Sequence, residues 1–393
     1  MTYIIDWSGR AIDYTEEEIA TILEVAQTAD PLTQGKYLSG LEENIKGYLD
    51  VDHAFALTSA ASALELIAVL SGLGPGDEVI IPSHTYCATA IPFGRTGATI
   101  VWADIDPESF VISPEDIQKK VTSKTKLLVI VHLYGLACDM DSIQKTCSEH
   151  NLLLIEDCAQ AIGAEYRGKK VGTFGDYSCF SFHAQKNITT LGEGGILVVK
   201  DSEKAKLIPG LRHNGHAPYG DQEEYWKPAM ANVDIDIKGV WPFNYSMTEV
   251  QAALGTKLIK RIDNLNDQRR NRGHRFIDAL SGYPELLFQK TNHEKQNVFH
   301  LLPARYDGAV YGKKNDDLIK LLSEKYSIKV IVQFYPLNRY PLFIKMGFAD
   351  ADCPNADFFF DNMVSFPFHH WMKEDDFKYM ISCTKLALDE LRL

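Results

Sequence analysis

The sequence predicts an α/β protein, with a mainly parallel sheet flanked by helices and a smaller α/β domain after it. Two observations favour this fold class. In the first half of the chain, short apolar runs of strand character alternate with segments of helical pattern, an order typical of β-α-β units. Residues 127–131 read Leu-Leu-Val-Ile-Val, apolar at every position, as expected for a parallel strand that is buried on both faces.

The individual elements follow from local signals. Ser113 before Pro114 predicts a helix start, since serine caps helices and proline suits the first helical position, and the helical pattern runs to residue 121. Strands are predicted at residues 78–81, 98–102, 127–131, 152–155 and 194–199, and a further helix at 139–150.

The second half of the chain predicts a separate, smaller unit. A long helix is expected from residue 247 to 280, then strands at 298–302 and 329–333 and helices at 315–325 and 374–391. The segment 213–244 is rich in Gly, Pro, Asn, Asp and aromatic residues and too long for a plain connection, which indicates a functional loop. We expect three parts: an N-terminal segment (1–30) that packs with the small domain, a large domain (31–250), and a long helix with the small C-terminal domain (251–393).

Composition excludes several classes of function. The chain has 393 residues and a net charge of −13, which argues against a nucleic-acid surface. No apolar run approaches about 20 residues, so no membrane span is expected, and the start lacks the pattern of a signal peptide. The seven cysteines are scattered without a CxxC pair, which indicates reduced thiols and a cytoplasmic location. His369 and His370 are adjacent but lack partner ligands, so no metal site is expected.

A lysine and an acid carry the strongest chemical signal. Lys186 lies in the run Ser-Phe-His-Ala-Gln-Lys-Asn-Ile-Thr-Thr, which leads into a glycine-rich turn at 192–195. Upstream, an apolar strand ends in Glu156 and Asp157. A pyridoxal phosphate enzyme needs a lysine that forms an imine with the cofactor aldehyde and an acid that keeps a proton on the pyridine nitrogen. We expect Asp157 to be that acid and Glu156 to be structural.

Six blocks of the chain, in this order, resemble the DegT/DnrJ/StrS family of sugar aminotransferases, which are fold type I pyridoxal phosphate enzymes. The resemblance runs from about residue 35 to the C-terminus. The blocks are residues 58–64 (TSAASAL), 74–80 (GPGDEVI), 131–135 (VHLYG), 156–161 (EDCAQA), 181–195 and 244–254 (NYSMTEVQAAL). The family includes sugar dehydratases with histidine in place of the lysine, so Lys186 argues for transamination.

The resemblance implies roles for individual residues. Catalysis falls to Lys186 and Asp157, and Asn244 reaches the phosphate of the other subunit, so that a homodimer shares its active sites. The remaining cofactor contacts implied are Tyr86 stacking on the ring, Gln160 on the phenolic oxygen, and Ala60, Ala61, Ser62 and Ser181 at the phosphate.

The chain departs from the family pattern at the cofactor phosphate and at the substrate side. Ala60-Ala61 stands where relatives have Gly-Thr, and Ser246 stands where many have arginine. Substrate contacts are expected from His183, Ser246 and Gln333. By resemblance, L-glutamate donates its amine to a nucleotide-linked keto sugar, in amino-sugar, surface polysaccharide or natural-product biosynthesis. Two alternatives stay open: a keto sugar or inosose without a nucleotide, and a non-catalytic pyridoxal phosphate-binding regulator. The sugar, its nucleotide and the choice of C3 or C4 also stay open.

Overall fold

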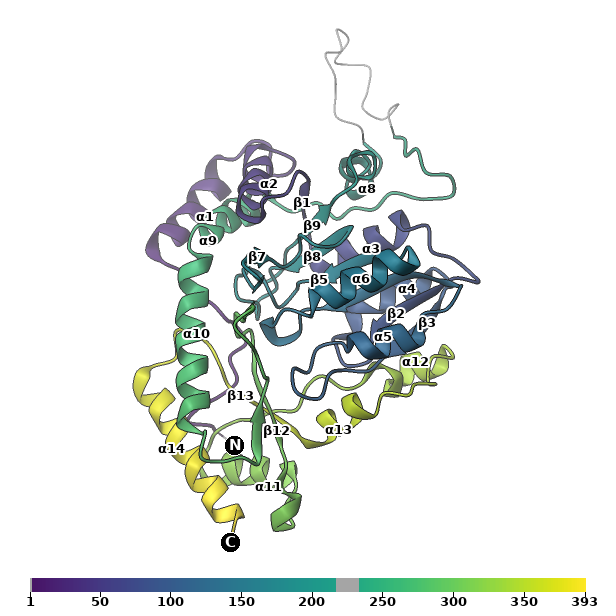
Figure 1. Cartoon of the computed structure of the whole chain (residues 1–393). Helices are drawn as coiled ribbons and strands as arrows, with labels where there is room; N and C mark the ends of the chain where they lie inside the picture. The colour runs from purple at the N-terminus through teal and green to yellow at the C-terminus, as the bar shows by residue number, and fades with distance from the viewer. Residues whose placement is uncertain (1, 217–232) are drawn as a thin grey trace.

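The computed structural model describes residues 2–216 and 233–393, and its centre is a seven-stranded sheet (Figure 1). Strand β9 runs antiparallel to both of its neighbours, and the other adjacent strands are parallel. The sheet is therefore mainly parallel, as the sequence predicts. Its order is β1 (Ala54–Leu57), β9 (Gly195–Val199), β8 (Tyr177–Ser181), β5 (Leu153–Asp157), β4 (Thr125–Val131), β2 (Glu78–Pro82) and β3 (Thr99–Ala103).

Helices that connect these strands start at side-chain caps. Ser59 accepts a hydrogen bond from the Ser62 amide at the start of α3, and Ser113 and Asp139 cap α5 and α6 in the same way. Such caps satisfy amide donors that have no partner within the helix. The helices around the sheet are α2 (Lys36–Leu49), α3 (Ala60–Leu70), α4 (Ile91–Arg95), α5 (Pro114–Lys120), α6 (Met140–His150), α7 (Ser202–Ala205) and α8 (Ile208–Arg212).

The long helix predicted over 247–280 is two helices, α9 (Glu249–Ile259) and α10 (Ile262–Ala279). At the break, Arg261 binds the buried Glu18 carboxylate of α1 (Glu16–Thr28), with Nε 2.6 Å from Oε1. The Glu249 carboxylate accepts hydrogen bonds from the amides of Gly35, Tyr37 and Leu38 at the start of α2. These contacts hold α1, α2 and α9 together, at the upper left of Figure 1.

A second, smaller sheet lies at the far end of α10, with a hydrophobic core of its own. The predicted strands at 298–302 and 329–333 are wrong. Residue 299 has a positive φ of 45°, which a strand does not tolerate, and residues 329–333 make only an isolated bridge from Ile331 to Ser365. The elements are β10 (Leu286–Phe288), β12 (Leu302–Tyr306), β13 (Met363–Phe366), α11 (Asn315–Lys320) and α14 (Glu374–Leu391).

The large sheet has a hydrophobic core of its own, and several segments of the chain pack against a core that is distant from them in sequence. Ile5 pairs with Ile328 beside the smaller core, whereas α1 packs on α9. Phe343 of α12 (Pro341–Lys345) and Phe359 of α13 (Pro354–Asn362) belong to the core of the large sheet. A third sheet consists of β6 (Glu165–Tyr166), β7 (Lys169–Lys170) and β11 (Lys295–Gln296).

The loop predicted over 213–244 is described at its ends, where His213 pairs with Asn244 and His216 with Val233. Residues 217–232 lie outside the described part of the chain. None of the helices within residues 2–216 and 233–393 combines the length and apolar character needed to cross a membrane.

Candidate active site

A cavity of about 650 Å³ opens at the carboxyl ends of the parallel strands. Ligands of open α/β sheets bind at this edge. One wall comes from the large sheet and from the start of α3, with Asp157 at the end of β5 and Ser181 at the end of β8. The other wall comes from distant segments: Trp7 and Arg10 near the N-terminus, and His300, Gln333, Phe334 and His369 from the C-terminal part.

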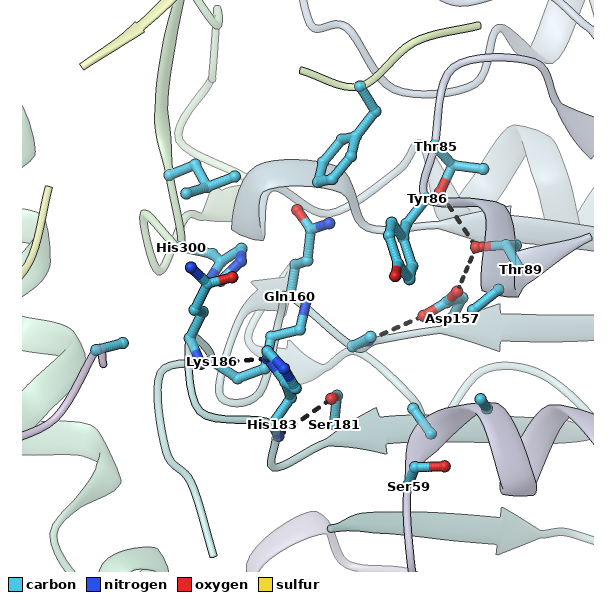
Figure 2. A pocket seen from close by; sticks show the side chains of 18 of the residues that line it. Ser59, Thr85, Tyr86, Thr89, Asp157, Gln160, Ser181, His183, Lys186 and His300 are labelled. Carbon is cyan, nitrogen blue, oxygen red and sulfur yellow. Dashed lines mark hydrogen bonds between the residues drawn. The ribbon is translucent and has the colours of Figure 1, made fainter. Parts of the chain in front are cut away.

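Asp157 is buried and lies at this edge with its carboxylate toward the cavity (Figure 2). Thr89 donates a hydrogen bond to Oδ2 at 2.8 Å, and the Ala159 amide donates to Oδ1 at 3.0 Å. The Cys179 thiol, a weak donor, lies 3.7 Å from Oδ1. These three donors still leave capacity on a carboxylate that has about four acceptor sites. Asp157 can therefore accept a proton donor from a ligand in the cavity.

Lys186 lies on the loop after β8, and its amine enters the same cavity. Burial lowers the pKa of Lys186 to about 8, against the attraction of the Asp157 carboxylate, which favours the charged amine. A lowered pKa increases the fraction of neutral amine near pH 7.5, and the neutral amine is the nucleophile that attacks an aldehyde.

The start of α3 forms an anion-binding end of the cavity. Ser59, Ala60 and Ala61 line it, and the first amides of a helix point free N–H groups and a partial positive charge at an anion. A Cβ on Gly195 would lie 2.3 Å from the Ser59 carbonyl carbon. Glycine at this position therefore lets β9 approach the helix start closely. Ser181 adds a hydroxyl whose oxygen accepts from the His183 amide at 3.3 Å, so its own O–H remains to donate.

Two further predicted residues line the cavity between these ends. The Gln160 side chain accepts from the Tyr134 amide at 2.8 Å, so its NH₂ group remains to donate to a ligand. Tyr86 is 54% exposed and lies edge-on to Phe334, with ring centroids 6.1 Å apart. An exposed aromatic face beside a donor amide is suited to a flat ring.

The structure brings most of the predicted site residues together and leaves three outside. Ser62 does not line the cavity, and its hydroxyl bonds to Ser59 and Thr58. Ser246 lies outside too, with its hydroxyl 3.1 Å from His213 Nδ1. Asn244 is exposed on the chain's surface, away from the cavity. The predicted residues that line the cavity are Ala60, Ala61, Tyr86, Asp157, Gln160, Ser181, His183, Lys186 and Gln333.

Sequence reasoning missed several lining residues, of which Thr89, Arg10 and His300 bear directly on the chemistry. Thr89 lies three positions after Tyr86, so a search for hydrogen-bonding side chains near Tyr86 could have found it. Arg10 and His300 lie far from every block in the sequence, and no local pattern marks them.

The lining fits pyridoxal phosphate on its chemistry. The cavity contains a primary amine of lowered pKa, a buried carboxylate with free acceptor capacity, an exposed aromatic face and a helix start for the phosphate. These are the partners that the cofactor's aldehyde, pyridine nitrogen, ring and phosphate require.

Comparison with known proteins identifies the family of the chain. The DegT/DnrJ/EryC1/StrS aminotransferase family matches residues 13–385. Spore coat polysaccharide biosynthesis protein SpsC of Bacillus subtilis is 32% identical over 375 residues, with 94% of each chain covered. GDP-perosamine synthase of Vibrio cholerae is 32% identical over 355 residues, with 90% of this chain and 91% of that protein covered.

Solved structures are similar over nearly the whole chain. Helicobacter pylori PseC, an aminotransferase involved in the biosynthesis of pseudoaminic acid, has a TM-score of 0.86 at 26% identity, covering 98% of this chain and 100% of that one. Spr1654 of Streptococcus pneumoniae, solved in a PLP form, has a TM-score of 0.85 at 25% identity, covering 99% and 100%. The chain belongs to the DegT/DnrJ/EryC1/StrS aminotransferase family and has the fold type I architecture.

Proposed function

We propose that this protein is a pyridoxal phosphate-dependent aminotransferase that moves an amino group from L-glutamate to a nucleotide-linked keto sugar, as a cytoplasmic homodimer. The observation that carries the proposal is the pairing of Lys186 and Asp157 in one cavity, with room beside them for a substrate. Relatives named GDP-perosamine synthase and dTDP-3-amino-3,4,6-trideoxy-alpha-D-glucose transaminase support the substrate class.

The geometry of the cavity supports a specific set of residues that would hold the cofactor. Lys186 would bind its aldehyde carbon, Asp157 would accept a hydrogen bond from its ring nitrogen, and Gln160 would donate to its phenolic oxygen. The helix start at Ala60 and the Ser181 hydroxyl would bind its phosphate. When bound, pyridoxal phosphate supplies an aldehyde that accepts the amino group and a ring that withdraws electrons.

The protein's own contribution is to place and move protons. Asp157 carries negative charge at the buried end of the cavity and so holds a proton on a ring nitrogen. Lys186 is expected to act as general acid and base at the substrate carbon that bears the amine. With a pKa of about 8, roughly a quarter of the Lys186 amine is neutral at pH 7.5, against about 0.1% for an ordinary lysine. Combination with the aldehyde should therefore accelerate as the pH rises toward 8.

Charged and polar groups that line the cavity favour an anionic substrate. Arg10 is the one arginine that lines the cavity among the described residues, and its Nε and Nη2 are bound by Ile12 and Asp13. That leaves Nη1 for a carboxylate or a diphosphate. Gln333 lines the same region, and its Nε2 is buried without a partner among residues 2–216 and 233–393. Ser246 hydrogen-bonds to His213, so we expect Arg10 to supply the charge that many relatives place at position 246.

Exposed groups outside the cavity support a shared dimer site. Asn244 is exposed in a single chain and does not reach its own cavity. Trp241 nearby is 85% exposed, an unusual state for a large aromatic side chain and one typical of residues that a partner covers. A second copy of the chain that covers Trp241 would bring its Asn244 to the phosphate end of the cavity.

The test separates the two halves of the reaction. L-glutamate mixed with the loaded enzyme should convert the bound cofactor to its amine form, which absorbance reports, and release 2-oxoglutarate. The amine form should then react with UDP-N-acetyl-3-dehydro-alpha-D-glucosamine, the keto sugar in a relative's name, or with another nucleotide-linked keto sugar. The comparison compounds are an inosose and a keto sugar phosphate. A preference for these two compounds would overturn the nucleotide-linked substrate, and binding without either half-reaction would indicate a regulator.

A further inference from the structure

His300 reaches the cavity from the C-terminal part of the chain, at a place where the backbone leaves regular structure. It is buried, lines the cavity and follows Phe299, whose φ is 45°. A bulky residue takes this conformation only when its surroundings impose it, and such positions cluster at functional sites. Figure 2 places His300 and Lys186 on the left of the view, and Asp157 and Thr89 on the right.

One face of α10 imposes the conformation. Arg269 is buried and donates from Nε to the Phe299 carbonyl at 2.8 Å and from Nη2 to the His300 carbonyl at 2.7 Å. One turn later, a Cβ on Gly273 would lie 2.6 Å from the Phe299 ring, so glycine makes room for that ring. Asn266 lies on the same face, three residues before Arg269. This face fixes the direction in which His300 leaves the backbone.

A chain of buried amides fixes which ring nitrogen of His300 carries the proton. Asn266 donates from Nδ2 to the Ile162 carbonyl, which orients its amide. Asn187 donates from Nδ2 to Asn266 Oδ1 at 3.1 Å and to the Val298 carbonyl at 3.2 Å. The Asn187 Oδ1 must therefore accept, and it lies 3.2 Å from His300 Nδ1. The proton sits on Nδ1, and Nε2 carries a lone pair.

The environment keeps the ring neutral. Burial, followed by the charges of Lys186 and Arg269, lowers the pKa of His300 well below its usual value. Within the described residues, the hydrogen bond of the ring is the one at Nδ1. Nε2 is therefore a hydrogen-bond acceptor on the cavity side across the physiological pH range.

We propose that His300 is a substrate-binding residue whose Nε2 accepts a hydrogen bond from a hydroxyl group of the keto sugar. The inference rests on the proposed function, and it names the part of the substrate that the His300 side chain binds. A lone pair repels the carboxylate oxygens of glutamate and the phosphate oxygens of a nucleotide, so neither is its partner. The amino group of glutamate is the reacting group at Lys186, which leaves the sugar hydroxyls as donors. Asn187 directly follows Lys186. The loop that carries the lysine therefore also fixes the tautomer of His300 that binds the sugar.

The sharpest variant is His300→Asn. Asparagine keeps a donor at the place of Nδ1, facing Asn187 Oδ1, and removes the acceptor at Nε2. We expect the half-reaction with L-glutamate to stay within about twofold of wild type, and the second-order rate constant with the keto sugar to fall at least about tenfold. The keto sugar is the one that wild type converts best in the panel above. His370→Asn is the matched control, since His370 is also buried nearby but does not line the cavity.

Equal losses in both half-reactions would overturn the assignment, and so would no loss in either. Failure of the proposed function differs from both, because wild type itself would then show no second half-reaction. If His300→Asn does not fold, the ¹⁵N chemical shifts of the His300 ring in the wild-type protein without cofactor test the proposed tautomer. The shifts should report a protonated Nδ1 and a bare Nε2 on His300 at pH 7, and a proton on Nε2 would overturn the proposal.

Discussion

Glu156 and Asp157 are the same kind of residue, adjacent on one strand, and the structure uses them in different ways. Successive side chains of a strand point to opposite faces. Glu156 Oε1 accepts from the amides of Phe174 and Gly175, and Oε2 accepts from the Gly172 amide and from His132 Nε2. Four donors thus surround the Glu156 carboxylate, whereas Asp157 has the Thr89 hydroxyl, the Ala159 amide and the weakly donating Cys179 thiol.

The difference teaches how to separate a structural acid from a functional one. A carboxylate whose acceptor sites are filled by its own chain stabilises the fold and has nothing left for a ligand. A carboxylate that faces a cavity and has unused acceptor sites can accept hydrogen bonds from a ligand. Substitutions on the cavity side, where Asp157 and Lys186 lie, should therefore impair catalysis with little loss of stability. Substitutions on the opposite face of β5, where Glu156 lies, should lower stability with little loss of catalysis.

Lys186→Ala should give the largest effect on the cavity side. Turnover should be abolished, because the other described lysines lie outside this cavity, while the free energy of unfolding should hardly change. Borohydride reduction of the loaded wild-type enzyme, followed by peptide mapping, should find the cofactor on Lys186. A label on another lysine would contradict the assignment.

Asp157→Asn should lower turnover at least about a hundredfold, roughly 2.7 kcal/mol of barrier, because the amide cannot hold a proton on the ring nitrogen. The side chain is nearly isosteric, so the denaturant midpoint of the cofactor-free protein should be kept. Rates of both half-reactions give the measurement. Near-normal rates would show that Asp157 is as structural as its neighbour.

Glu156→Gln makes the matching change on the far face. The new amide would point its NH₂ at backbone donors, which leaves buried groups unpaired and should cost about 2 kcal/mol of unfolding free energy. Chemical denaturation of the cofactor-free protein measures this, and turnover per folded molecule should stay near that of wild type. A loss of turnover without a loss of stability would break the comparison.

The cavity side was predictable from sequence because its residues sit in short local blocks. Asp157 ends an apolar run, Gln160 follows three residues later, and Lys186 lies in a run of small and hydroxyl residues. The topology of a parallel sheet then brings strand ends to one edge. The β-α-β order was predictable where a strand contains a short apolar run, as in β2, β3, β4 and the start of β5, whereas β1 and β8 were not predicted.

Apart from Gln333, the opposite wall was not predicted, because tertiary contacts override its local pattern. Residues 298–302 are apolar enough for a strand, but α10 bends the backbone at Phe299 and turns His300 into the cavity. Its partner Asn187 is 113 residues away. The break between α9 and α10 likewise depends on Glu18, more than two hundred residues upstream of Arg261.

Asn244→Ala tests whether a second chain contributes Asn244 to the phosphate end of the cavity. Asn244 is exposed in the single chain, so stability should be kept, while we expect cofactor retention to weaken about tenfold, roughly 1.4 kcal/mol. Dialysis followed by absorbance of the retained cofactor measures this. Gln251→Ala, in the same block but engaged with Thr190 and Glu193 carbonyls of its own chain, is the control.

Mixing Asn244→Ala chains with Lys186→Ala chains distinguishes a shared site from a site formed by one chain. After verified subunit exchange, a shared site would restore about a quarter of the sites in a random mixture of dimers. If each chain supplies both residues to its own cavity, the mixture stays as inactive as its parents.

Thr89→Val should give the smallest effect and sharpens the comparison most finely. Thr89 donates to Asp157 Oδ2, and its oxygen lies 3.2 Å from the Thr85 hydroxyl. Valine keeps the shape and removes that donor, so Asp157 keeps the Ala159 amide and the weak Cys179 thiol donor, both at Oδ1, and orients less firmly toward the cavity. We expect turnover to fall about threefold, less than 1 kcal/mol of barrier, and Thr89→Ser to restore it because the hydroxyl returns. Steady-state rates with L-glutamate measure the change. If Thr89→Val lowered stability as much as Glu156→Gln and left turnover unchanged, then the carboxylate of Asp157 would owe its orientation to packing, and counting unfilled acceptor sites would no longer separate the two acids.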